Sequence, residues 1–150
     1  MLFPSQVESK YDKRAKFRRE TPSAGKRRGV VSGWQSDYYD AAGTPRANLV
    51  VYVYRSDADA LAAYKDACPT RCVPQKVPGN LGIRAKYTPQ SIGRTAGGGL
   101  TVRCVAVVSV RQNVYAAVVS CAVASYPLKS LAYDGGYLIG LVHKKAQLLS

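Results

Sequence analysis

The sequence contains one histidine, His143, and no apolar run near the roughly 20 residues that a membrane-spanning helix needs. Catalysis by a Ser or Cys nucleophile needs a neighbouring base, and the chain offers no second imidazole. We expect His143 to be a solvated residue near the carboxyl end of a surface helix. The glycine-rich stretch IGRTAGGGLT lacks a Walker lysine and precedes a strand rather than a helix. The sequence therefore predicts a non-enzymatic protein that needs no cofactor.

Acidic residues are also scarce, at 9 against 22 Lys and Arg, which gives a formal net charge of +13. The excess is concentrated at the amino end, because residues 1–32 hold nine basic and three acidic side chains. Such a field attracts nucleic acid, anionic lipid or an acidic envelope polymer. A solvated basic surface accounts for it equally well, so charge alone names no partner.

Residues 1–29 are interpreted as a basic tail and linker, and residues 30–150 as a single domain. Within the tail, residues 5–20 have the composition of a polar helix, and residues 21–29 (TPSAGKRRG) are typical of a linker. The tail is expected to be disordered, to dock on the domain or to reach a membrane surface. The start, MLFPSQ, lacks the features of a signal peptide, so we expect either a cytoplasmic chain or one whose leader is absent.

The strongest structural signal is the Val-rich run at residues 100–125, LTVRCVAVVSVRQNVYAAVVSCAVAS. It predicts two β-strands joined by a tight turn at Gln112 and Asn113, where the Asn can adopt a positive φ. A two-residue turn that pairs Arg111 with Val114 also pairs Cys104 with Cys121. That pair falls at a closely spaced position of the ladder, where a disulfide can form.

Four cysteines, an even number, suit two disulfides and an oxidising compartment. The hairpin register favours Cys104–Cys121, which leaves Cys68–Cys72 to close a small loop. A zinc site made of all four cysteines is a rival, although its C-x3-C half is looser than the usual zinc knuckle. Free buried thiols are a third reading, and the residues alone leave these alternatives open.

The remaining elements follow from periodicity and capping signals. Ser56 is expected to cap a helix, and Gly135-Gly136 is expected to separate a short helical turn from the last helix. We expect strands at 30–40, 48–55, 81–87 and the two halves of the hairpin, and helices at 56–67 and about 137–149. The order β-β-α-β-β-β-α predicts an α+β fold, with a mostly antiparallel sheet of about five strands and helices packed as an α/β sandwich.

Aromatic residues gather on the expected strands. Tyr52 and Tyr54 share one side of the sheet because successive strand residues alternate faces. Together with nearby aromatic and basic residues they would offer stacking surfaces and a partner for an anion. The candidate ligand-binding residues are Trp34, Tyr38, Tyr52, Tyr54, Arg84 and Arg103. The alternative is that the aromatics fill the core beneath the helices.

The run GGGLTVRCVAVVSVRQNVYAAVVSC and the helix after it resemble the extracytoplasmic sensor domain of mycobacterial PknH-type receptor serine/threonine kinases. Small lipoproteins that share this domain are similar as well. The likeness rests on sixteen residues between Cys104 and Cys121, on the Arg-Gln-Asn-Val turn at residues 111–114, and on YVYRSDADALAAYKDAC upstream. It covers roughly residues 34–149, and the chain lacks the family's lipobox, kinase domain and membrane span. The resemblance implies an α/β sandwich with a concave ligand-binding face and no catalysis.

We therefore expect a non-enzymatic, extracytoplasmic ligand-binding or sensor-like domain of a cell-envelope protein. Its ligand is unknown and is expected to be anionic or an envelope polymer. One rival is a cytoplasmic nucleic-acid-binding protein that uses a basic, Tyr-rich surface. The other is a structural or assembly component whose basic tail docks on a partner.

Overall fold

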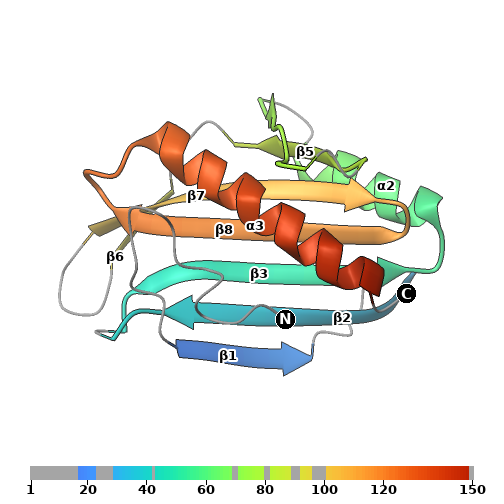
Figure 1. The fold of residues 1–150 in the computed structure, drawn as a ribbon, viewed down its shortest axis with the longest axis horizontal. Coiled ribbons are helices and arrows are strands. Elements are labelled where there is room, and N and C mark those ends of the chain that lie inside the picture. The colour runs from blue at the N-terminus through green and yellow to red at the C-terminus, as the bar shows by residue number, and fades with distance from the viewer. Residues whose placement is uncertain are drawn as a thin grey trace.

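The computed structural model describes residues 17–22, 29–41, 43–68, 71–79, 82–88, 92–95 and 101–148. In these residues one antiparallel sheet carries the strand order β1-β2-β3-β8-β7-β5-β4, and β6 pairs with β7 beside this path. Helix α3 crosses one face of the sheet and helix α2 lies on the other (Figure 1). The elements are β1 (Phe17–Pro22), β2 (Val30–Tyr39), β3 (Pro45–Tyr54), α2 (Asp57–Ala67), β4 (Val73–Pro74), β5 (Arg84–Tyr87), β6 (Ile92–Thr95), β7 (Thr101–Arg111), β8 (Val114–Val123) and α3 (Leu128–Leu148).

The α+β class is confirmed, but the sheet has more strands than the sequence predicted. The additional strands are β1, β4 and β6, all at the margins of the sheet. Strand β1 pairs along its whole length with β2, in a segment where the sequence predicted a helical tail. Its sequence, FRRETP, has the charged composition and the Pro that edge strands tolerate. The rest of that expected helix, residues 5–16, lies outside the described residues.

The two faces of the sheet carry separate apolar clusters. On one face Leu138, Ile139 and Val142 of α3 pack over the inner side chains of β3, β7 and β8. On the other face Ala60 of α2 packs over Tyr52 and its neighbours. Strand β3 lies in the middle of the sheet and contributes to both clusters, because its sequence is apolar on both faces. Neither α2 nor α3 is both long and apolar enough to cross a membrane.

Helix α3 is continuous through Gly135 and Gly136, where the sequence predicted an interruption. Both glycines allow close approach rather than a turn. A Cβ on Gly135 would lie 2.6 Å from Val107 Cγ2, and one on Gly136 would lie 2.7 Å from Gln75 Nε2. Because these two glycines have no Cβ, the helix can pack closely between the sheet and the segment that follows β4. The packing free energy gained in this way offsets the weak helix propensity of glycine.

The β7–β8 hairpin has the predicted register, with Arg111 opposite Val114 and Cys104 opposite Cys121. The turn differs in one detail. Gln112 adopts the positive φ, at 50°, and Asn113 does not. The Asn113 side chain instead donates a hydrogen bond to the Tyr54 carbonyl at 3.0 Å, while the Tyr54 N–H donates to the Asn113 carbonyl at 2.8 Å. Asn113 thus ties the turn to the end of β3.

We expect Gln112→Gly to raise the free energy of unfolding by about 1 kcal/mol, because a positive φ at the first turn position strains any residue with a Cβ. Urea denaturation followed by circular dichroism measures the change. Gln75→Gly, at a position with no positive φ, is the control and should not stabilise the protein. A Gln112→Gly variant that is less stable than the parent would contradict this account of the turn.

Candidate functional site

Both disulfides expected from the spacing are formed. Cys104 and Cys121 face each other across β7 and β8 with their Cα atoms 4.1 Å apart, and both are buried beside Val102 and Val119. Cys68 and Cys72 bond to each other immediately after α2, with their Cα atoms 6.2 Å apart. The cysteines therefore form two separate covalent links, and the four-cysteine zinc site does not form.

The six candidate ligand residues do not line one cleft. Tyr52 and Tyr54 share a face as expected, and both are buried in the cluster beneath α2. Tyr38 is fully buried on the opposite face, in the cluster beneath α3. Trp34 pairs with Val51, which places it on the α3 face, and it is 45% exposed. The tyrosines thus serve mainly as core residues on two different faces.

The two candidate arginines are also separated by the sheet. Arg84 pairs with Val110 on the α2 face, and Arg103 pairs with Ala122 on the α3 face. Both side chains are exposed, and Arg103 donates a 3.4 Å hydrogen bond to the Ala124 carbonyl. The physical reason for the split is the cross-strand register, which places these residues on opposite faces.

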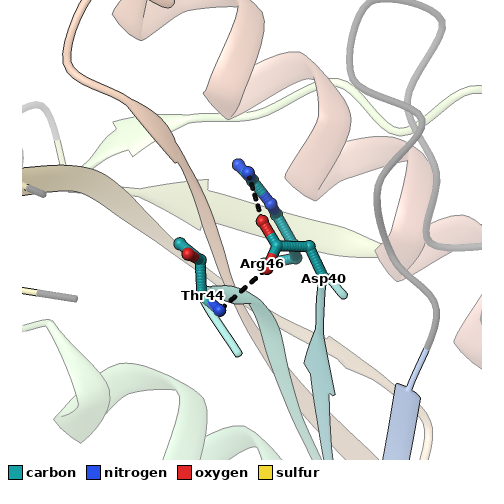
Figure 2. A network of polar contacts seen from close by, with 3 residues as sticks. All are labelled: Asp40, Thr44 and Arg46. Atoms are coloured by element: carbon teal, nitrogen blue, oxygen red, sulfur yellow. Dashed lines mark hydrogen bonds and ion pairs between the residues drawn. The ribbon is translucent and has the colours of Figure 1, made fainter. Parts of the chain in front are cut away.

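A buried polar network closes the turn between β2 and β3 (Figure 2). Arg46 Nη2 lies 2.9 Å from Asp40 Oδ2, and both side chains are less than one-tenth exposed. Asp40 Oδ1 also accepts a 2.8 Å hydrogen bond from the Thr44 backbone N–H. One carboxylate therefore holds both the turn backbone and the guanidinium, which indicates a structural role for this network.

A second polar group lies beneath α3 and was not expected there. His143 was predicted to be solvated, but its side chain is 2% exposed and points at the sheet. Its Nε2 lies 2.9 Å from the Oγ of Ser109 on β7, and that residue is also fully buried. The helical period of the sequence does indicate that His143 is buried, because it follows Ile139 by four residues and so lies on the same apolar stripe of α3.

The protons of this pair can be assigned from its partners. Ser109 Oγ lies 2.9 Å from the carbonyl oxygen of Ala116, which can only accept a hydrogen bond. The hydroxyl proton therefore points to Ala116, and Ser109 Oγ accepts a hydrogen bond from the protonated Nε2 of His143. A catalytic base would have to accept the serine proton instead. The pair thus has the hydrogen-bond direction of a structural contact.

Arg111 lies near His143 on the same face of β7, two residues beyond Ser109. Burial, and to a smaller extent the positive charge of Arg111, together lower the pKa of His143 to about 4. The Nη1 atom of Arg111 is buried and has no hydrogen-bond partner in the described part of the chain. Arg111 as a whole remains partly exposed at the end of the strand. An unpartnered, buried guanidinium N–H is costly, and the Oγ of Ser120 on the same face of the sheet is also buried without a partner among the described residues.

We expect stability to fall on acidification because the pKa of His143 is about 4 when folded and 6.5 when unfolded. Between these two pH values the unfolded chain binds more protons than the folded chain. The stabilisation that comes from keeping His143 neutral is therefore complete above pH 6.5 and is lost as the pH falls to 4. The loss is about 3 kcal/mol. Urea denaturation across this pH range measures it. His143→Gln keeps a hydrogen-bond donor for Ser109 but does not titrate. If its free energy of unfolding showed the same dependence on pH, His143 would not be the group responsible.

Exposed aromatic and basic side chains lie together on the outer side of α3. Tyr133 and Tyr137 are 61% and 47% exposed and stand one helical turn apart. Lys129 and Lys144 are exposed on the same side, because their positions differ from these tyrosines by near-integral numbers of turns. We call these four residues the α3 surface stripe. These exposed tyrosines lie on a helix, whereas the sequence predicted a tyrosine-rich surface on the strands.

Among the described residues, no group of three or more His, Cys, Asp or Glu side chains could hold a metal ion. The polar features described above include the buried His143–Ser109 contact, the Nη1 atom of Arg111 with no acceptor among the described residues, and the α3 surface stripe. No protein-family model matches the chain, and no curated protein does so either.

Proposed function

We propose that this protein is a non-enzymatic extracytoplasmic domain that binds an anionic ligand, as a sensor-like or envelope-associated module. The observation that carries the proposal is the pair of disulfides, Cys104–Cys121 and Cys68–Cys72, which use all four cysteines. Structural disulfides persist in oxidising compartments and are rare in the reducing cytosol. The excess of basic residues, +13 overall, supports an anionic ligand.

The absence of catalysis is part of the same proposal. It is supported by the direction of the Ser109–His143 hydrogen bond, in which the imidazole donates and does not activate the hydroxyl. It is supported further by the low pKa of His143, about 4, because efficient acid–base catalysis requires a pKa near the working pH.

The test is the state of the cysteines in the cells that make the protein. Cells are lysed into a thiol-alkylating reagent and denaturant, so that the thiols are trapped before they can oxidise. Mass spectrometry then counts the alkylated cysteines, with and without prior reduction. We expect no alkylation before reduction and four alkylated cysteines after it. Four alkylated cysteines without reduction would place the protein in a reducing compartment and overturn the proposal.

A second candidate is nucleic-acid binding, which the α3 surface stripe favours. Exposed tyrosines flanked by lysines can stack on bases and contact phosphates. Under this candidate an oligonucleotide of single-stranded DNA binds in a salt-sensitive manner. Tyr133→Ser combined with Tyr137→Ser then weakens binding, by about 1–3 kcal/mol for each lost stacking contact. Lys65→Gln, which alters an exposed lysine on α2 across the sheet, is the matched control. Binding that is unaffected by the tyrosine changes removes this candidate.

A further inference from the structure

Beneath α3, the buried His143 faces a positively charged group and, among the described residues, no side-chain carboxylate that acts on its pKa. His143 faces β3, β7 and β8, and the one charged group that acts on its pKa from these strands is Arg111 of β7. The residues of β3 and β8 on this face are apolar or hydroxyl-bearing: Ala47, Leu49, Val51, Ala116, Val118 and Ser120. On α3 itself the neighbouring charges are Lys144 and Lys145.

In the described part of the chain, the sequence explains why no carboxylate lies beside Arg111. Strands β3, β7 and β8 contain no Asp or Glu, and the last acidic residue of the chain is Asp134. Asp134 accepts a 2.7 Å hydrogen bond from the Tyr126 hydroxyl near the amino end of α3, far along the helix from His143. The charge pair that the structure gives, Asp40 with Arg46, holds the β2–β3 turn.

Arg111 is therefore a guanidinium with unmet hydrogen-bonding capacity. Its Nη1 has no acceptor among the described residues, although the side chain is partly exposed beside the turn at Gln112. The strongest partners of a guanidinium are planar or tetrahedral oxyanions, which accept two of its N–H groups at once. Arg111 thus offers the donors for such a group at the turn end of the hairpin.

We propose that Arg111 binds an oxyanion, a carboxylate or a phosphate, at the turn end of β7, and that His143 senses its occupancy. The anion accepts hydrogen bonds from the donors of Arg111 that are open to solvent, and it offsets the charge of the guanidinium. It thereby removes part of the repulsion that disfavours a proton on His143. Because such coupling is reciprocal, the anion binds more tightly as the pH falls. This inference rests on the proposed function for the anionic nature of the ligand, and it names the residue that receives it.

The single histidine of the chain makes the site directly observable. The NMR signals of the His143 ring are followed through pH titrations with no anion, with inorganic phosphate and with acetate. A parallel set contains vesicles of phosphatidylglycerol or, as a neutral control, phosphatidylcholine. We expect phosphate or acetate to shift the ring signals and to raise the pKa of His143. A shift with phosphatidylglycerol vesicles alone assigns the oxyanion to a lipid headgroup.

Two arginine variants separate this site from a general charge effect. Arg111→Gln removes the guanidinium and is expected to weaken the anion response roughly tenfold or more. It should also raise the pKa of His143 without any anion, because a neighbouring positive charge is gone. Arg103→Gln, on the same strand and the same face, should leave the response unchanged. Circular dichroism verifies that each variant is folded.

The proposal is overturned if none of the three probes moves the His143 signals, or if Arg111→Gln responds as the parent does. Should Arg111→Gln fail to fold, Arg111→Lys keeps the charge but loses the two-pronged donor. A weakened response in that variant supports the site, and an unchanged one removes it. Failure here is distinct from failure of the proposed function, which depends on the oxidation state of the cysteines.

Discussion

Asp40→Asn is expected to lower the free energy of unfolding by about 3–5 kcal/mol, because it neutralises the carboxylate that faces a buried guanidinium. Arg46 is 6% exposed at its side chain, and its Nη2 lies 2.9 Å from the carboxylate that the substitution neutralises. The same carboxylate accepts the Thr44 N–H, so the turn backbone loses part of its support as well (Figure 2). Denaturant unfolding at neutral pH measures the change.

Two further variants locate the origin of this effect. Asp37→Asn is the matched control, since Asp37 is half-buried and accepts its hydrogen bond from the neutral amide of Asn48. We expect it to cost about 1 kcal/mol. Asp40→Asn combined with Arg46→Met should recover much of the loss, because the penalty comes from the buried charge that faces the neutralised residue. A single Asp40→Asn variant within about 1 kcal/mol of the parent would show that water reaches Arg46.

The hairpin could be predicted in detail because its information is local. The strand propensity, the two-residue turn and the cysteine spacing all lie within residues 100–125 and agree on one register. The N-cap at Ser56 could be predicted for the same reason, and its Oγ accepts a 3.1 Å hydrogen bond from the Asp59 N–H. Local signals of this kind determine a register without knowledge of the rest of the sheet.

Features that depend on distant contacts were missed. Gly135 looked like a helix breaker, and only the approach of Val107 explains why a glycine belongs in that helix. The sequence also could not place Tyr38 and Tyr52 on opposite faces, because their placement depends on the register between β2 and β3, in which Tyr38 pairs with Ala47 and Gly33 pairs with Tyr52. A register one residue different would have put both tyrosines on the same face.

The candidate site was missed for a related reason. Ser109 interrupts an apolar strand, and His143 interrupts the apolar stripe of a helix more than thirty residues later. Either residue alone suggests a solvated position. Only the packing of α3 on β7 shows that they satisfy each other, and only burial shows that Arg111 is left without an acceptor among the described residues. A buried polar residue becomes interpretable once its partner is known.

Replacing both Cys104 and Cys121 with Ala is expected to lower the free energy of unfolding by about 3 kcal/mol. The disulfide joins residues separated by 17 positions on two central strands. Its loss therefore raises the conformational entropy of the unfolded chain, which lowers the free energy of unfolding. Both sulfurs are also buried, and their removal leaves a space beside Val102 and Val119. Urea denaturation under non-reducing conditions measures the change.

The matched control is Cys68→Ala with Cys72→Ala, which opens a loop with a separation of only 4. Chain entropy predicts a smaller cost there, about 2 kcal/mol, since the stabilisation grows with the logarithm of loop length. Reduction of the parent should produce about the sum of the two effects, because the links lie in different parts of the fold. If the short loop proves as costly as the long one, chain entropy is not the main source of the stabilisation. The disulfides would then stabilise the fold through the contacts that each pair makes, such as the hydrogen bond from Lys86 Nζ to the Cys68 carbonyl at 3.0 Å.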